Sequence, residues 1–294
     1  MAVEKYKDIV FRGDSPRLIE TINSILVEYE EQGLTLSVRQ VFYQLVARDC
    51  IANTKAVYTK ISNLLNDARI AGLIDWDMIE DRTREFKRRQ RWGSAAEILT
   101  TVAKSFHMDL WEGQEMRAFC VVEKDALSGV LEPVCRKYDL PLLAAKGYPS
   151  VSILREFAEL DILPTIEEGQ SVIVFHLGDH DPSGIDMTRD LRERLSMFSR
   201  HDVEVVRLAL NMPQVEELKP PPNYGKPKDK RYAEYKKQYG DKTWELDALR
   251  PDYMSSLIED QVRKIIDFDQ WDERLEEIDS IKARLNKVAE EFGG

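Results

Sequence analysis

The segment SVIVFHLGDHDPSG, residues 171–184, joins an apolar run typical of a buried β-strand to two aspartates and a proline-led helix start. An earlier apolar run, Arg117–Val122, ends at Glu123. Hard divalent cations prefer oxygen ligands, and carboxylates that follow strand ends can meet at one point of a sheet edge. Glu123, Asp179 and Asp181 are therefore predicted to bind magnesium, with manganese as a possible substitute.

Strand-like and helix-like segments alternate around these two runs. Such alternation predicts an α/β fold with a mainly parallel sheet and helices on both faces. Binding sites of these sheets lie beyond the carboxyl ends of the strands, where all three carboxylates fall. Strands are expected at Arg117–Val122, Leu140–Ala144, Ser171–Leu177 and Val203–Leu210, and helices at Leu127–Tyr138, Pro149–Leu160 and Pro182–Phe198.

The N-terminal part of the chain has helical patterns instead. Apolar residues recur at helical spacing over Pro16–Tyr29 and over residues 54–71. Between them, Ser37-Val38-Arg39-Gln40 has the Ser-x-x-Gln form of a capping box, which predicts a helix to about Arg48. With Leu73–Trp76 as a wing strand, these three helices resemble a winged helix-turn-helix module.

The chain has 294 residues, 43% hydrophobic and 32% charged, which suits two domains on the usual prior of about 150 residues each. We expect residues 1–112 to form a DNA-binding winged-helix domain, including a helical segment after Ser94. Residues 113–294 are expected to form a metal-binding α/β domain with two helices at its end. An apolar stripe from Trp271 to Phe292 is predicted to pack against its own domain or a second subunit.

The sequence has no feature of a membrane or secreted protein. No apolar stretch approaches the length of about 20 residues that a membrane helix needs. The N-terminal sequence lacks the layout of a signal peptide, and three widely spaced cysteines form neither a disulfide framework nor a metal finger. We expect a cytoplasmic protein, associated with the nucleoid through DNA.

The net charge of −11 argues against nonspecific coating of nucleic acid, but the basic residues are unevenly distributed. Residues 219–242 hold eight basic residues against three acidic ones. A single charged run is usually a solvated face, whereas two separate basic segments favour phosphate binding. The second basic segment lies earlier in the chain. Its candidate DNA contacts are Arg84, Lys87, Arg88, Arg89 and Arg91.

The acidic motif has a structural alternative. An Asp-x-Asp pair after a strand is a weak signal on its own, because Asp181-Pro182-Ser183 also suits an ordinary helix start. Glu123 at a second strand end favours the metal site. His176 and His180 suggest transition-metal ligands, but a carboxylate-rich site favours magnesium or manganese, and isolated histidines are more often structural.

Glu123 and the Asp179-x-Asp181 pair on an alternating sheet look like the Toprim domain of topoisomerases, primases and some nucleases. The segment Lys146-Gly147-Tyr148-Pro149, followed by Arg155, narrows the resemblance to the A subunit of type IIB topoisomerase (topoisomerase VI) and its meiotic double-strand-break relatives. The resemblance covers about residues 15–255. It is closest to compact stand-alone versions, often called Mini-A, and implies a Toprim domain in the second half of the chain.

In that family a winged-helix domain precedes the Toprim domain and carries an Arg-Asp-x-aromatic-Tyr motif whose tyrosine attacks DNA. The corresponding stretch is Arg39-Gln40-Val41-Phe42-Tyr43, so Gln40 stands where the family has aspartate. A tyrosine with a pKa of about 10 needs a base or nearby cations to become a nucleophile, and Arg39 lies one turn earlier on the same helix face. From pattern alone, Tyr43 reads as a core residue; the family motif favours catalysis.

The resemblance implies that Tyr43 attacks a backbone phosphorus, giving a 5′-phosphotyrosyl intermediate and a free 3′-hydroxyl, with magnesium stabilising the phosphate. It also implies a homodimer on double-stranded DNA, in which the tyrosine of one subunit works with the metal site of the other. A separate ATPase (B-type) subunit is a further expected partner. Lys146 and Arg155 are candidate phosphate contacts or plain surface charges. A Toprim nuclease that uses water and a noncatalytic DNA-binding protein remain open alternatives.

Overall fold

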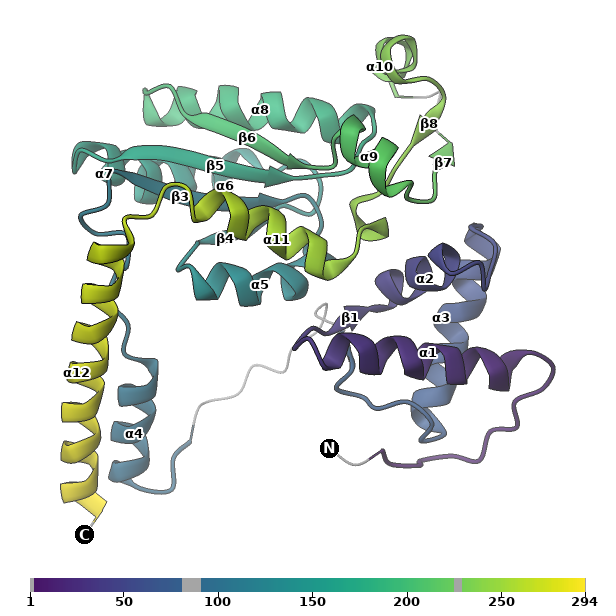
Figure 1. Cartoon of the computed structure of the whole chain (residues 1–294), viewed down its shortest axis with the longest axis horizontal. Coiled ribbons are helices and arrows are strands. Elements are labelled where there is room, and N and C mark those ends of the chain that lie inside the picture. The colour runs from purple at the N-terminus through teal and green to yellow at the C-terminus, as the bar shows by residue number, and fades with distance from the viewer. Residues whose placement is uncertain (1–2, 81–90, 225–228, 294) are drawn as a thin grey trace.

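A computed structural model describes residues 3–80, 91–224 and 229–293 and contains a four-stranded parallel sheet, seen in the upper part of Figure 1. The strand order is β4-β3-β5-β6, and β3 pairs with β5 along its whole length. The predicted α/β fold with a parallel sheet is confirmed. The strands are β3 (Met116–Val122), β4 (Leu142–Ala144), β5 (Ser171–Leu177) and β6 (Glu204–Ala209).

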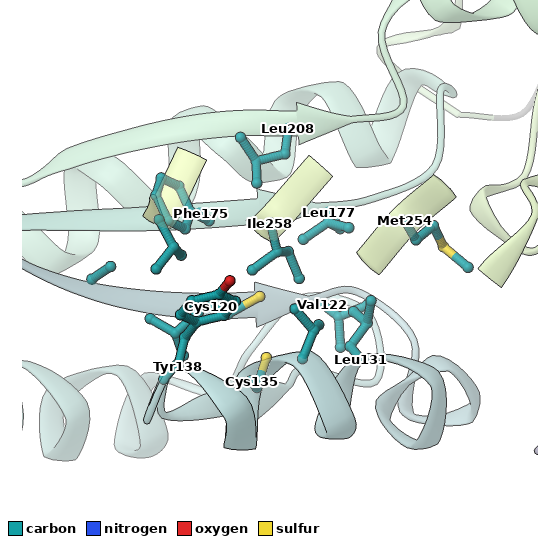
Figure 2. Packing of buried hydrophobic residues seen from close by; sticks show 14 of the residues in the cluster. Cys120, Val122, Leu131, Cys135, Tyr138, Phe175, Leu177, Leu208, Met254 and Ile258 are labelled. Carbon is teal, nitrogen blue, oxygen red and sulfur yellow. The ribbon is translucent and has the colours of Figure 1, made fainter. Parts of the chain in front are cut away.

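Alternate residues of the central strands face two different helical layers, as the period of two in a strand requires. On one face, Cys120 and Val122 of β3 lie opposite Cys135 and Leu131 of α5 (Figure 2), and α11 completes this core. On the other face, Phe119 packs in a core with α6 and α8. The helices of the two layers are α5 (Ser128–Lys137), α11 (Pro251–Val262), α6 (Val151–Phe157) and α8 (Pro182–Ser199).

The first three helices pack round a hydrophobic core of their own. Ser37 forms the predicted capping box at the start of the second helix: its hydroxyl accepts the Gln40 N–H at 3.3 Å, and Gln40 Oε1 accepts the Ser37 N–H at 2.8 Å. The helices are α1 (Ser15–Glu30), α2 (Val38–Ala47) and α3 (Lys55–Ile70).

The wing strand predicted at Leu73–Trp76 is wrong. Asp75 accepts the backbone N–H of Asp77 at 2.9 Å, which makes a local turn in place of extended chain. A strand follows a few residues later, where β2 (Ile79–Glu80) pairs in parallel with β1 (Leu36–Ser37). A short pair of parallel strands therefore accompanies the three helices.

α4 (Ala95–Ser105) packs along α12 (Phe268–Gly293), apart from the first three helices (Figure 1). Residues expected to belong to the first domain thus lie beside the C-terminal helix. The apolar stripe of α12 is only partly covered, because Trp271 is buried whereas Phe292 is 66% exposed. The division into two domains itself remains a prediction.

The remaining elements follow the sheet or cross its carboxyl edge. The helix predicted at Pro149–Leu160 begins at Val151 and continues through one wider turn into α7. No helix in the described ranges has the length and apolar character needed to cross a membrane. These elements are α7 (Leu163–Glu167), α9 (Met212–Leu218), α10 (Tyr232–Tyr239) and the antiparallel pair β7 (Asn223–Tyr224) and β8 (Lys242–Thr243).

Candidate active site

Parallel pairing of β3 and β5 brings Glu123 and Asp179 together just beyond the carboxyl ends of both strands. The backbone N–H of Glu123 donates to Leu177 O at 2.9 Å, which continues the sheet by one residue. Glu123 Oε2 in turn accepts the backbone N–H of Asp179 at 2.9 Å. Both carboxylates are buried, with exposed fractions of 9% and 8%.

Asp181 caps the start of α8, as the structural alternative for the acidic motif predicts. Its Oδ1 caps α8 by accepting the Gly184 N–H at 2.7 Å and the Ser183 hydroxyl at 2.8 Å, and the residue also lines a cleft with Asp179. The loop is tight at Gly184, where a Cβ would lie 2.2 Å from the Asp179 carbonyl oxygen. A side chain at this position would push the first helix turn away from the carboxylates.

Lys124 lies among three carboxylates. Its Nζ is 2.9 Å from Asp179 Oδ1 and 3.1 Å from Glu245 Oε2, and it also contacts Asp247 Oδ2. Burial alone would lower the pKa of Lys124, but the three carboxylates raise it well above its usual value. The ammonium therefore stays charged and serves as a built-in counter-ion at the sheet edge.

The single positive charge of Lys124 does not neutralise all the carboxylates at this edge of the sheet. Burial and the neighbouring Asp179 raise the pKa of Glu123 to about 7. Burial raises the pKa of Asp179 to about 6, although Lys124 opposes the shift. Asp247 is fully buried, and its Oδ1 has no hydrogen-bond partner among the described residues. Raised pKa values of two buried carboxyl groups indicate a site short of positive charge.

The oxygen donors suit magnesium or manganese in chemistry, being hard carboxylate ligands at a buried, charge-deficient edge. In the described part of the chain, no three His, Cys, Asp or Glu side chains converge into a ready metal-binding group. Lys124 occupies the space beside Asp179 instead. The residues that would hold a cation are Glu123, Asp179 and Asp181.

Tyr43 and Arg39 lie on the face of α2 that is directed toward the acidic edge of the sheet. Arg39 forms an ion pair with Glu245 at 2.8 Å. The side-chain amide of Asn223 donates to the Tyr43 hydroxyl at 3.3 Å and to Glu245 Oε1 at 3.1 Å. Tyr43 is only 3% exposed, and burial, followed by the charge of Glu245, raises its pKa to about 12.

A single cleft of about 670 Å³ joins the two groups of residues. Four residues predicted from the sequence line this cleft. Glu123 is not among its lining residues but accepts a hydrogen bond from the backbone N–H of Asp179, which is. Burial would raise the pKa of Glu245 in the wall, but Lys124 and Arg39 lower it. The four predicted lining residues are Arg39, Tyr43, Asp179 and Asp181.

The histidine between the two aspartates is held by an aromatic segment. Its Nδ1 lies 2.7 Å from the Tyr235 hydroxyl, and its backbone pairs with Trp244. Burial lowers the pKa of His180 to about 4, so the ring is neutral. Because the Tyr235 hydroxyl also faces two carbonyl oxygens, it donates to one of them and accepts from His180 Nδ1–H. His180 therefore anchors the loop.

The Arg207 side chain also binds the loop that carries the two aspartates, mainly through backbone carbonyl oxygens. Its guanidinium donates to Gly178 O at 2.9 Å, Asp179 O at 2.6 Å and Gly184 O at 2.7 Å. Burial lowers the pKa of Arg207 to about 10, which leaves it charged at neutral pH. The arginine thus fixes the backbone from which the aspartates project.

The other predicted contacts lie away from the cleft or outside the described residues. Lys146 follows β4 and pairs with Asp125 at 3.2 Å, while Arg155 pairs with Glu159 on an exposed turn of α6. In the described structure neither lines the cleft. Arg91 is exposed. The residues outside the described ranges are Arg84, Lys87, Arg88 and Arg89.

Sequence reasoning missed the residues that complete the cleft. Glu245 and Asp247 repeat the carboxylate-x-carboxylate spacing of the aspartate pair, which is a signal that was available. Lys124 follows Glu123 directly, but nothing nearby in the sequence indicates its three partners. Asn223 lies in a proline-rich stretch with no recognisable motif.

No protein-family model matches the sequence, and no curated protein matches it significantly.

Proposed function

We propose that this chain is a DNA-cleaving transesterase similar to the A subunit of type IIB topoisomerase, with its first three helices as a winged-helix unit and its parallel sheet as a Toprim unit. The observation that carries the proposal is the cleft that Tyr43 and Arg39 share with Asp179 and Asp181. A hydroxyl nucleophile, a guanidinium and carboxylates for a divalent cation are the groups that phosphodiester transfer needs.

The substrate of the proposal is double-stranded DNA. Lys55 and Arg39 both line the cleft and offer positive charge to a backbone phosphate. Arg39 is engaged with Glu245 in the free protein, so an incoming phosphate would compete with this carboxylate for the guanidinium. Lys146 and Arg155 are exposed and remain candidates for more distant phosphate contacts.

In the proposed reaction the Tyr43 hydroxyl oxygen attacks phosphorus, the P–O3′ bond breaks, and the 5′-phosphate stays on the tyrosine. Glu245, whose carboxylate shares the Asn223 side-chain amide with the Tyr43 hydroxyl, receives the phenolic proton, and the departing O3′ takes up a proton from water to leave a 3′-hydroxyl. Asn223 donates to the tyrosine oxygen and so favours the phenolate. A divalent cation on the carboxylates, when bound, stabilises charge on the phosphate and the leaving oxygen.

Trapping the covalent intermediate tests this proposal. Supercoiled plasmid is incubated with the protein and magnesium or manganese, and the reaction is stopped with denaturant to retain any protein–DNA adduct. We expect an adduct with wild type, none with Tyr43→Phe or Glu123→Ala, and an adduct with the matched control Tyr58→Phe, because Tyr58 lines the same cleft. Full cleavage by Tyr43→Phe would refute the role of the tyrosine.

A metal-dependent nuclease that uses water is the second candidate. The burial of Tyr43 and its pKa of about 12 favour this candidate, because both disfavour the phenolate. Such an enzyme would cut DNA without an adduct, and Tyr43→Phe would leave the cleavage rate unchanged. The same plasmid assay therefore separates the two functions.

A further inference from the structure

His176 has a buried ring nitrogen that the proposed reaction does not use. The residue lies near the end of β5, and its side chain is fully buried. Its Nδ1 is 2.8 Å from the Thr188 hydroxyl on α8, whereas its Nε2 has no hydrogen-bond partner among the described residues. Buried polar atoms are nearly always paired in folded proteins, so an unpaired ring nitrogen next to a candidate site requires an explanation.

The hydrogen bonds of Thr188 indicate which ring nitrogen of His176 carries the proton. Arg207 can only donate, and its guanidinium donates to Thr188 Oγ1 at 3.0 Å. The hydroxyl hydrogen of Thr188 is then free to be donated to His176 Nδ1. Burial and the charge of Arg207 lower the pKa of His176 to about 3, so the ring is neutral and carries one proton. Because Nδ1 accepts, this proton lies on Nε2, which is therefore an unpaired donor.

Gly178 brings His176 Nε2 close to the Glu123 carboxylate. A Cβ built on this glycine would lie 3.2 Å from His176 Nε2 and 2.9 Å from Glu123 Oε2, so both atoms lie close to the same point. Glu123 Oε2 accepts the Asp179 N–H at 2.9 Å, and a carboxylate oxygen has a second lone pair for another donor. An unpaired donor and an acceptor with a second lone pair therefore lie near each other at the end of β5.

We infer that His176 is a positioning residue for Glu123: its Nε2–H donates through one bridging water to Glu123 Oε2 and holds the carboxylate in the orientation that binds a divalent cation. Water commonly bridges polar groups that are too far apart for a direct hydrogen bond. The role in cation binding rests on the proposed function, whereas the hydrogen bond to Glu123 does not. Partners that fix a metal ligand in this way change metal affinity about 10–100-fold when they are removed.

Two substitutions of His176 separate the roles of its ring nitrogens. An asparagine amide lies near the Nδ1 position and a glutamine amide near the Nε2 position, so His176→Asn keeps the contact with Thr188 and His176→Gln keeps a donor toward Glu123. In calorimetry at pH 8, His176→Asn should bind manganese about tenfold more weakly than wild type, and His176→Gln within about threefold of it. A histidine that only fills the core would leave the two affinities equal. Equal affinities, or weaker binding by His176→Gln, would overturn the inference.

The position of the ring proton can be measured on the metal-free protein. Nitrogen-15 NMR distinguishes a protonated from an unprotonated imidazole nitrogen, and the signals of His176 are identified by their loss in His176→Gln. At pH 8, above the pKa of Glu123, we expect the proton on Nε2 and a shift of the Nε2 resonance in Glu123→Gln. The control Glu234→Gln changes an exposed glutamate of α10 and should cause no shift. A proton on Nδ1, or an Nε2 resonance that does not respond to Glu123→Gln, would overturn the inference.

These measurements separate the inference from the proposed function. If wild type binds manganese and shows the difference between asparagine and glutamine but forms no protein–DNA adduct, transesterification is refuted and the positioning role of His176 stands. If wild type binds no manganese, the proposed metal site is refuted and the role of His176 in cation binding falls with it. The ring measurement then still decides whether the hydrogen bond to Glu123 exists.

Discussion

Replacing Lys124 by methionine should destabilise the metal-free protein strongly, because three carboxylates would lose their shared ammonium. Removing one partner of a buried ion pair costs about 3–5 kcal/mol of the free energy of unfolding. Lys124 contacts Asp179, Glu245 and the fully buried Asp247, so a value in this range is expected at pH 7.5 in EDTA. The midpoint temperature should fall by about 6–20 °C.

Added divalent cation should restore part of this loss. A cation that binds the folded state alone stabilises it by about 2.7 kcal/mol at a concentration one hundred times its dissociation constant. We expect magnesium or manganese to stabilise Lys124→Met more than wild type, because the removed ammonium no longer competes for Asp179. Urea unfolding followed by tryptophan fluorescence, in EDTA and in each metal, measures both effects.

Lys137→Met is the matched control. Lys137 also pairs with a carboxylate, Glu259 at 2.8 Å, but its side chain is 58% exposed. An exposed pair of this kind contributes about 0–1 kcal/mol. The reasoning is refuted if Lys124→Met and Lys137→Met lose the same small amount of stability, or if metal stabilises both to the same extent as wild type.

Three further results are expected. The folded-state pKa of Glu123 is raised to about 7, above its unfolded value, so the folded state binds the extra proton. Metal-free wild type should therefore lose stability relative to Glu123→Gln as pH rises from 4.5 to 7.5, and thermal unfolding that shows no relative loss would contradict this. Tyr235→Phe leaves a buried imidazole N–H without its acceptor and should cost about 1–3 kcal/mol in urea unfolding, against less than about 1 kcal/mol for Tyr232→Phe, whose hydroxyl bonds an exposed aspartate. Gly184→Ala places a Cβ 2.2 Å from a carbonyl oxygen and should cost about 3 kcal/mol or more, whereas Gly93→Ala meets only a flexible glutamate; equal losses in calorimetry would refute the steric argument.

Much of the sheet could be predicted from the sequence because each strand is an apolar run between turn residues. Parallel pairing then places the residue after each strand at the same edge, so the proximity of Glu123 and Asp179 follows from topology. The wing strand at Leu73–Trp76 could not be excluded in this way, because its apolar pattern suits a strand, and the turn at Asp75 depends on one side-chain bond.

The completion of the cleft could not be predicted, because it depends on contacts between distant parts of the chain. Lys124 meets Glu245 and Asp247 more than a hundred residues later, and Asn223 meets Tyr43 across an even longer separation. Periodicity describes neighbours along one element and carries no information on such pairs. The packing of α4 on α12 is another contact of this kind.

The anchoring of the aspartate loop has a consequence for the order in which the protein forms during synthesis. The fourth strand of the sheet ends at Ala209, but the loop takes partners as late as Trp244 and Leu246, which bond His180 and Asp179. All four strands are therefore synthesised before the residues that shape the acidic edge of the sheet. We expect a chain that ends just after Ala209 to lack the ordered loop of Asp179 and Asp181, and this order to appear only when the chain reaches Leu246.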